Sequence, residues 1–398
     1  MRPLEGLFVL DLAQYLAGPS ATLRLADLGA RVVKLERPGS GDACRRLRLA
    51  DLVLPHEADS DSAGRADSAA SADRSDRSDS LLFHTINRGK ESVAVDLADP
   101  ADRSRLLQLV PHADVLVHSF RPGALDRFGL DYAAVAELNP RLVYAHVSGY
   151  GEEGPWRSLP GQDLLVQARS GLAWLNGTAA DPPEPLGLSV VDHLAGAYLV
   201  EGVLACLVRR GVTGRGGLVQ VSLLEAAMDL QFEVFTGYLN GGGTPIRSEV
   251  SAAHPFVGGQ YGIYQTSDAW IALAMGSLSL LGELLGVPDL AATPEAPHGL
   301  DRDAVKRALA GVLRTRTTSD WLAILVPAGY WCAEVRDWPA LEESGVLDAL
   351  RMVVEHRTDE RAFRGTRCPV RIDGQVLAAP GVAPRLGEHA ELPGGQAD

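Results

Sequence analysis

The sequence contains little of the chemistry on which several classes of protein depend. Four of its 398 residues are cysteines, and none of them are spaced as the CxxC of a zinc knuckle or a redox motif. The ten histidines form no HxxxH or HExxH pair, so we predict no metal site. Lysine occurs at three positions, and no segment is a basic run in a chain of net charge −14. Nucleic acids and anionic membranes require clustered Lys and Arg, so neither is expected as a partner.

Long hydrophobic runs are also scarce. No stretch of about 18 uncharged apolar residues occurs, because the strongest candidate is interrupted by Glu201, and we predict no transmembrane helix. Glu5 and Asp11 interrupt the apolar amino-terminal stretch, which is not the layout of a signal peptide. Hydrophobic residues make up 46% of the chain, so a soluble protein with a sizeable core is expected. With so few cysteines, we predict a cytoplasmic location.

The amino-terminal part alternates short apolar segments with helical patterns. Such alternation, with helices of about ten to fifteen residues, indicates a parallel sheet with right-handed crossovers. The predicted fold class is therefore α/β, with a Rossmann-like, doubly wound large domain. The expected strands are 7–13, 30–36, 92–98, 114–120 and 141–151, and the expected helices are 18–29, 101–113 and 130–139.

The rest of the chain follows a different pattern. Residues 58–79 are rich in Ser, Asp and Ala, which favours a mobile surface loop, with a regulatory or partner-binding loop as the alternative. A long helix is expected from 187 to 210, followed by a glycine turn, a short strand and a helix that ends at 241–243. A hairpin is expected within 254–276, with its turn at Ser267 and Asp268. This part is expected to form a smaller α+β domain.

The first turn between strand and helix, DLAQYLAGP, is where a doubly wound fold places its ligand. It lacks the GxGxxG pattern of dinucleotide-binding proteins, so an NAD-dependent enzyme is not expected. Gly18 and Pro19 open a helix whose free N–H groups could meet a phosphate or carbonyl group. A plain helix start explains these two residues equally well.

Basic residues stand close to the ends of the predicted strands. Each cluster taken alone also fits a solvated loop. Taken together, the clusters favour an anionic ligand along one side of the sheet. They are Arg37, Arg45 and Arg46 after the second strand, Arg88 and Lys90 before the third, and Arg121 and Arg127 after the fourth.

Asp192 stands between an apolar segment and the long helical pattern, in the stretch SVVDHLAG. Aspartate is among the best helix N-caps, and this residue would cap a helix that begins at His193. A carboxylate at a helix amino terminus is stabilised as the anion, and an ionised, oriented carboxylate is also what a nucleophile requires. The residues alone favour the capping role.

Eight motifs occur in a fixed order along almost the whole chain. With this set the sequence resembles the family III CoA-transferases of the CaiB/BaiF type, which include formyl-CoA:oxalate and carnitine CoA-transferases. The motifs are GLFVLDLAQYLAGP, LADLGARVVKLERPGSGD, NRGKESVAVDL, ADVLVHSFRPGALDRFGL, NPRLVYAHVSGYGEEGP, QDLLVQARSGL, TGRGGLVQVSLLEAA and LGEHAEL.

The resemblance implies a domain plan and a site. The plan is a large CoA-binding domain (1–210), a linker and small domain (211–330), a return to the large domain (331–398), and an interlocked homodimer. Asp192 matches the catalytic aspartate of the transferases. The implied CoA contacts are Gln14, Tyr15, Ala17, Arg37, Val95, Phe120, Arg127 and Phe128.

The implied reaction moves CoA from an acyl-CoA thioester to a carboxylic acid, through an aspartyl anhydride and an aspartyl-CoA thioester. Coenzyme A is a substrate in this chemistry, and no permanently bound cofactor is expected. The implied partners are a second copy of the chain, an acyl-CoA and a small carboxylic acid. Gly258, Gly259 and Gln260 match the glycine-rich loop that covers the nucleophile in the family. Backbone N–H groups of such a loop could stabilise the oxyanions.

The sequence departs from the family pattern in three places, one of which is the Ser/Asp-rich stretch 58–79, longer than is usual in the family. Leu16 stands where some transferases have an assisting glutamine, and the chain stops shortly after LGEHAEL, where the family normally continues through a helix. Two other hypotheses stay open. A 2-methylacyl-CoA racemase would have GHD where this chain has GQD, and Gln162 cannot act as an acid or base, while Asp163 would cap the helix that follows it. The third hypothesis is a CoA-binding protein without activity.

Overall fold

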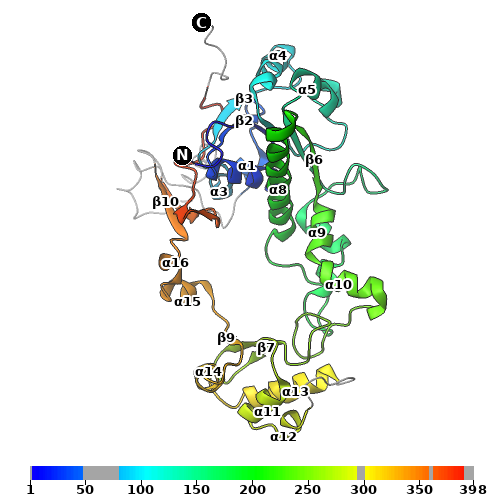
Figure 1. Cartoon of the computed structure of the whole chain (residues 1–398), viewed down its shortest axis with the longest axis vertical. Helices are drawn as coiled ribbons and strands as arrows, with labels where there is room; N and C mark the ends of the chain where they lie inside the picture. Colours follow the sequence, from blue (N-terminus) through cyan, green and yellow to red (C-terminus); the bar gives the residue numbers. More distant parts are fainter. Residues whose placement is uncertain (1, 48–79, 294–300, 358–361, 390–398) are drawn as a thin grey trace, which may run out of the picture. The chain divides into compact units, whose positions relative to one another are not determined.

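The computed structural model describes residues 2–47, 80–293, 301–357 and 362–389 (Figure 1). The expected loop 58–79 lies outside these residues. The chain separates into two compact units. Unit 1 comprises Met1–Asp163, Ser189–Ala226 and Val346–Asp398, and unit 2 comprises Leu164–Leu188 and Ala227–Gly345. These boundaries differ from the expected 210 and 330, because unit 2 includes an earlier segment and the chain returns to unit 1 only at Val346.

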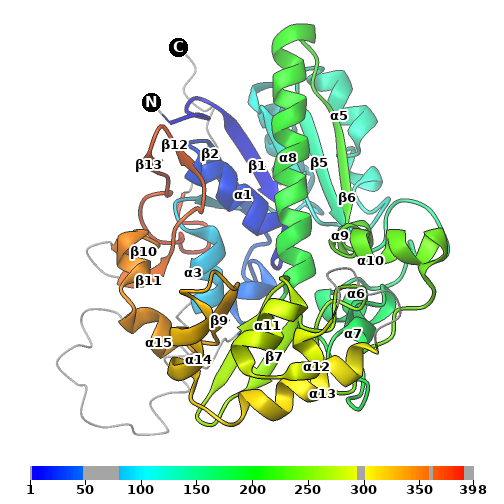
Figure 2. The same ribbon diagram turned by 60° about the horizontal axis from the view of Figure 1, so that its bottom comes forward.

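Unit 1 is built on a parallel sheet with six strands among the described residues, in the order β3-β2-β1-β4-β5-β6. Figure 2 labels β2, β1, β5 and β6 of this sheet. This strand order is that of the Rossmann-type doubly wound folds. The alternating pattern of the sequence therefore gave the right fold class. The strands are β1 (Phe8–Leu12), β2 (Arg31–Glu36), β3 (Glu91–Ala94), β4 (Val115–His118), β5 (Val143–Ser148) and β6 (Gly217–Ser222).

Helices cover both faces of this sheet. On one face, Leu106 of α4 and Val135 of α5 join a buried cluster with Leu10 and Leu116 of the strands. On the other face, Gly18 of α1 lies against Val147 of β5, and α8 packs on α1, β5 and β6. The helical elements are α1 (Ala17–Asp27), η1 (Ala43–Arg45), α3 (Leu81–Asn87), α4 (Pro100–Leu109), η3 (Val110–His112), η4 (Asp126–Phe128), α5 (Tyr132–Leu138), α8 (Val190–Thr213) and the start of α9 (Leu223–Leu230).

The long helix α8 runs three residues further than the predicted 187–210, because Gly214 ends it in a left-handed conformation with φ 71°. By length and composition α8 could cross a membrane, and it is the one such helix among the described residues. A core helix of a soluble protein meets the same criterion. In α8, 28% of the apolar window is buried, with Val191, Ala195, Leu199 and Val203 among the buried residues, and a single such helix is weak evidence for a membrane span.

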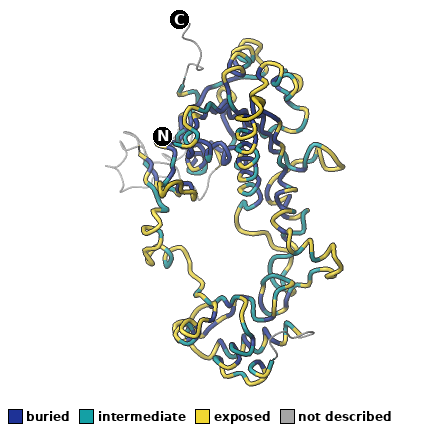
Figure 3. Tube along the Cα trace, viewed as in Figure 1, coloured by how far each residue is buried: buried dark blue, intermediate teal, exposed yellow. Residues whose placement is uncertain are grey.

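The carboxy-terminal segment belongs to unit 1. Ala379 N donates to Asp27 Oδ1 (2.7 Å), and Gly89 N donates to Val382 O (3.2 Å). Backbone groups of the segment thus form hydrogen bonds with the end of α1 and with the residue Gly89, which precedes β3. Most residues of α1 are buried (Figure 3). Its regular elements are α16 (Val346–Ala349), β10 (Val353–Arg357), β11 (Ala362–Thr366), β12 (Arg371–Ile372) and β13 (Gln375–Val376).

Unit 2 has an antiparallel sheet β7-β8-β9 and a core shared with helices, which confirms the predicted small α+β arrangement. The predicted hairpin is present, because Gln265 pairs with Trp270 across the turn. The helix expected to reach 241–243 is instead broken into α9, α10 and a π-helical turn. The other elements are α6 (Asp163–Arg169), α7 (Leu172–Leu175), α10 (Phe232–Gly237), η5 (Tyr238–Gly242), β7 (Gly262–Gln265), β8 (Trp270–Leu273), α11 (Leu278–Leu285), α12 (Pro288–Ala291), α13 (Arg302–Leu313), α14 (Thr318–Leu325), β9 (Cys332–Glu334) and α15 (Trp338–Glu343).

Candidate active site

The residues implied to contact CoA follow the carboxyl ends of neighbouring strands. Gln14 follows β1, Arg37 follows β2, Val95 follows β3 and Phe120 follows β4. Since these strands are parallel and adjacent in the order β3-β2-β1-β4, the four residues share one edge of the sheet. The strand order reverses between β1 and β4, because β2 and β3 are added on one side of β1 and β4 to β6 on the other, and ligands of open α/β sheets bind at such a point. Gln14 N donates to Ser119 Oγ across this point (2.9 Å).

The turn after β1 has an unusual backbone. Tyr15 has φ 65°, in the left-handed region that side chains with a Cβ atom rarely adopt, and its side chain is 53% exposed. Its N–H group donates to Asp42 Oδ1 (3.3 Å), and α1 begins two residues later at Ala17. A strained conformation of this kind persists only where the surroundings hold it.

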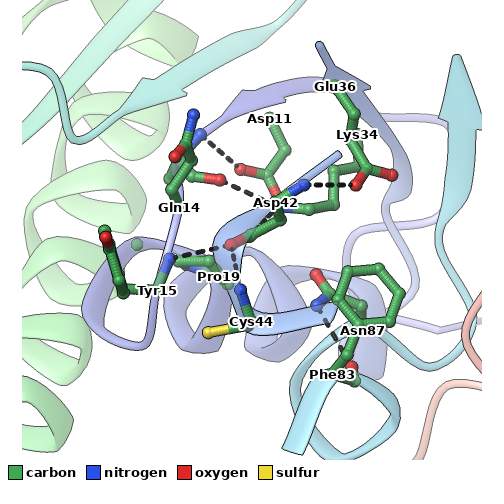
Figure 4. A network of polar contacts seen from close by, with 12 residues as sticks. Asp11, Gln14, Tyr15, Pro19, Lys34, Glu36, Asp42, Cys44, Phe83 and Asn87 are labelled. Carbon is green, nitrogen blue, oxygen red and sulfur yellow. Dashed lines mark hydrogen bonds and ion pairs between the residues drawn. The ribbon is translucent and has the colours of Figure 1, made fainter. Parts of the chain in front are cut away.

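Asp42 and Lys34 make contacts that fix the backbone conformation of this turn (Figure 4). Asp42 Oδ1 also accepts from Cys44 N (3.0 Å), and Asp42 Oδ2 pairs with Lys34 Nζ (2.9 Å). Lys34 Nζ in turn donates to Ala13 O (2.8 Å). Both side chains of the pair are 1% exposed. The first turn is thus tied to the loop after β2 by a buried ion pair.

A second buried pair lies beneath the same turn. Lys90 Nζ contacts Asp11 Oδ2 (2.9 Å) and also reaches Thr22 Oγ1 (2.7 Å) and Asn87 Oδ1 (2.8 Å). Burial by itself would raise the pKa of Asp11, but the charges of Lys90 and Lys34, together with the hydrogen bonds from Thr22 and Lys90, outweigh it, so this pKa lies below its usual value. Burial lowers the pKa of Lys90 to about 8. This cluster supports the amino-terminal half of α1.

Three of the seven basic residues interpreted as anion-binding groups have other partners. Arg45 pairs with Glu36 (2.6 Å), Arg88 pairs with Asp27 (2.9 Å) and Lys90 pairs with Asp11, and all three cations are buried. A buried charge needs a buried counter-charge, and these pairs already provide it. The interpretation is therefore wrong for these three residues. The basic side chains exposed at this edge are Arg37, Arg46, Arg121 and Arg127.

The segment after β4 presents Phe120 and, within η4, Arg127 and Phe128. The Arg127 guanidinium lies over the Phe128 ring, 4.6 Å from its centre. His146 Nε2 contacts Phe120 O at 2.8 Å, and His118 stacks on His146 with ring centres 4.2 Å apart. Burial lowers the pKa of His118 to about 2, so this stacked pair is not doubly charged near neutrality.

Asp192 occupies a different position from the one predicted. The helix α8 begins at Val190, so Asp192 lies in its first turn and is not its N-cap. Among the described residues, the side chain of the actual N-cap, Ser189, makes no capping hydrogen bond. Asp163 Oδ2 takes that role, accepting from Val191 N (2.8 Å) and Asp192 N (3.0 Å). The prediction that Asp192 caps the helix is wrong, because a distant carboxylate does so.

The charge state of Asp192 also differs from the expectation. Burial, followed by the negative charge of Asp163, raises the pKa of the Asp192 carboxyl to about 7. The helix terminus was expected to keep this group ionised, but burial and the neighbouring charge of Asp163 oppose its ionisation. A carboxylate of raised pKa is a stronger base, and basicity generally increases nucleophilic strength.

The close packing of α8 on α1 places Asp192 beside the first turn. A Cβ atom at Gly196 would stand 2.7 Å from Ala17 O and would also meet Ser20 Oγ. Gly196 follows Asp192 by one helical turn. Burial and the charges of Asp42 and Asp192 raise the pKa of the Cys44 thiol to about 12, so Asp192 is within electrostatic reach of the loop after β2. Asp192 therefore shares the edge of the sheet that carries the implied CoA contacts.

The glycine-rich stretch Gly258–Gln260 lies in unit 2 and is held by its neighbours. Tyr264 Oη donates to Gly259 O and Gln260 O (3.1 Å each), and Gln260 Nε2 donates to Gly276 O (2.8 Å). Lys306 Nζ donates to Tyr261 O (2.6 Å) just beyond the stretch. Among the described residues, no group of three or more His, Cys, Asp or Glu side chains could hold a metal ion.

The sequence matches the family model for CoA-transferase family III over residues 4–390. The chain belongs to this family. It is 34% identical over 335 residues to acetyl-CoA:oxalate CoA-transferase of Acetobacter aceti, covering 82% of this chain and 79% of that protein. It is 31% identical over 400 residues to succinate–glutarate CoA-transferase of Agrobacterium fabrum, covering 97% and 94%. This family III chain is therefore an enzyme, a transferase.

Solved structures agree with this assignment. The crystal structure of Rv3272 from Mycobacterium tuberculosis matches with a TM-score of 0.79 at 29% identity, covering 98% of each chain. A CaiB/BaiF family protein from Brucella suis matches with a TM-score of 0.77 at 28% identity, covering 98% of this chain and 97% of that one. The relatives are named as transferases, which does not favour the racemase hypothesis.

Sequence reasoning missed several residues that shape this family III site. Asp42, Lys34 and Gly196 were not singled out, and Asp163 was expected to serve the helix after it. The GSGD turn and a glycine within an apolar helix were weak signals for two of them. Their partners, however, lie on other strands and helices, so no local pattern could identify those partners.

Proposed function

We propose that this enzyme transfers CoA from an acyl-CoA thioester to a small carboxylic acid, with Asp192 as the nucleophile. The observation that carries the proposal is the position of Asp192, one turn before the contact between α8 and the first residue of α1. The family membership supports it, as do relatives whose names pair a CoA donor with oxalate, glutarate or mesaconate. We accordingly propose a dicarboxylate as donor acid or acceptor.

The proposed reaction begins with attack of an Asp192 carboxylate oxygen on the thioester carbonyl. The C–S bond breaks, CoA leaves as a thiolate, and a mixed anhydride remains on Asp192. The thiolate then attacks the aspartyl carbonyl and releases the donor acid as its carboxylate, leaving an aspartyl-CoA thioester.

The acceptor carboxylate completes the cycle. It attacks the aspartyl-CoA thioester, displaces the thiolate and forms a second anhydride, and the thiolate then attacks the acceptor acyl carbon and frees Asp192. Each step exchanges acyl bonds of similar energy, so no net input is required. Water must be excluded while the anhydrides exist, and we propose that Gly258–Gln260 help to exclude it.

The experiment traps the covalent intermediate. The enzyme is incubated with acetyl-CoA or succinyl-CoA, then with hydroxylamine, and its peptides are analysed by mass spectrometry. A hydroxamate on the peptide that contains Asp192 is expected, together with CoA transfer to oxalate, succinate or glutarate. Asp192→Asn should abolish both signals while leaving CoA binding intact. Full turnover by this variant would overturn the assignment of the nucleophile.

A further inference from the structure

Asp163 stands at the amino end of α8, against the backbone of Asp192. Its Oδ2 atom accepts from Val191 N (2.8 Å) and from Asp192 N (3.0 Å). The residue is 9% exposed and lies 28 positions before Val191 in the chain. A helix cap normally comes from the residue that precedes the helix. Here it comes from another segment of unit 1 and brings a full negative charge.

We propose that Asp163 is a positioning residue of the transfer reaction, which holds the backbone of Asp192 with its carboxylate and places a second negative charge beside the nucleophile. The inference rests on the proposed function, because it gives Asp163 a task in the chemistry of Asp192. It separates two effects of one side chain: the hydrogen bonds that orient the first turn of α8, and the charge that acts on the carboxyl group.

The charge effect follows from the groups around Asp192. The adjacent His193 has a pKa lowered by burial and by Arg24, so its imidazole is neutral near pH 7. The Cys44 thiol, on the loop after β2, has a pKa of about 12 and is also neutral. Asp163 therefore contributes a like charge that makes ionisation of Asp192 harder. Removing that charge makes Asp192 ionise at lower pH and leaves it a weaker base.

The test compares two variants by their pH profiles. Asp163→Asn keeps an amide oxygen that can accept both backbone hydrogen bonds but carries no charge. Transfer is measured from about pH 5 to about pH 9 with the donor and acceptor that the wild type uses. We expect the acidic limb of kcat to move to lower pH, so that the variant keeps a larger fraction of its plateau rate at pH 6 than the wild type. Its plateau rate should be lower and its KM for acyl-CoA unchanged.

The second variant removes both effects. Asp163→Ala also loses the acceptor atom, so a lower melting temperature and a lower kcat at every pH are expected. If this variant does not fold, Asp163→Asn carries the test alone. An acidic limb of Asp163→Asn that superimposes on that of the wild type would overturn the inference. A wild type that transfers no CoA would instead contradict the proposed function, so the two failures are distinguishable.

Discussion

Gly196 of α8 lies so close to Ala17 of α1 that a Cβ atom on the glycine would stand 2.7 Å from the Ala17 carbonyl oxygen. The two residues bring the helix that carries Asp192 against the helix that opens the proposed CoA site. Real Cβ atoms essentially never come within 3.0 Å of another heavy atom of this kind. The distance between the proposed nucleophile and the first turn therefore depends on the absence of a side chain at position 196.

We predict that Gly196→Val separates α8 from α1 and lowers kcat on the order of 10–100-fold, because displacing a reacting group by about 1 Å has effects of that size. CoA transfer and CoA binding are measured in parallel. Gly211→Ala, on the same helix, is the matched control. A Cβ atom at Gly211 would meet no other part of the described residues within 4 Å. This variant should keep full activity and stabilise the helix by about 0.5–1 kcal/mol. A fully active Gly196→Val enzyme would show that the contact between α8 and α1 does not determine the position of Asp192 relative to the first turn.

We predict that Asp192→Asn stabilises the protein at high pH. The folded-state pKa of about 7 lies above the usual 3.8, so ionised Asp192 opposes folding. By linkage, the favourable contribution of the protonated form is present below about pH 4 and is lost as the pH rises through 7. The variant should exceed the wild type at pH 8 by at most about 4 kcal/mol and match it near pH 4.

Thermal unfolding at the two pH values measures this difference. Glu201→Gln, at an exposed position of the same helix, is the control and should show no comparable dependence on pH. An equal gain at both pH values would mean that the amide substitution stabilises the protein for a reason unrelated to ionisation.

We predict that Asp42→Asn weakens both stability and acyl-CoA binding. The amide oxygen can still accept from Tyr15 N and Cys44 N, but Lys34 would lose its buried counter-charge. Breaking a buried pair costs about 3–5 kcal/mol. Denaturant titration measures the free energy of unfolding. The KM for acyl-CoA measures whether the turn between β1 and α1 still binds the substrate. The control is Glu91→Gln, which breaks the more exposed pair with Arg31 and should cost no more than about 1 kcal/mol.

We predict that Gly259→Ala lets water compete for the acyl intermediate. A Cβ atom at this position would stand 2.8 Å from Val305 Cβ, so the stretch Gly258–Gln260 must shift away from α13. The ratio of acyl-CoA hydrolysis to CoA transfer should rise. The control is Gly311→Ala, on the same helix as Val305. A Cβ atom at Gly311 would meet nothing within 4 Å among the described residues, so this variant should leave the ratio unchanged. An unchanged ratio in Gly259→Ala would argue against a shielding role.

The fold of unit 1 could be predicted because its signal is local. Each predicted strand, such as 141–151, contains the observed element or overlaps it, here Val143–Ser148. Strand ends were less accurate, because pairing with a neighbour decides them: β3 ends at Ala94 where the pairing with β2 stops. Apolar periodicity reports burial along one segment and carries no record of which segment lies beside it.

In the candidate site, too, local features could be predicted from the sequence, whereas contacts between distant residues could not. The sequence by itself determined the strand–helix alternation, the family motifs and the presence of a carboxylate at the start of a long apolar helix. Only the tertiary structure decided that Asp163 caps α8, that Asp42 and Lys34 hold the first turn, and that Arg45 and Arg88 are already paired. The physical reason is that burial and charge pairing join residues far apart in the chain, and these two effects set which charges face the site and at which pH Asp192 ionises.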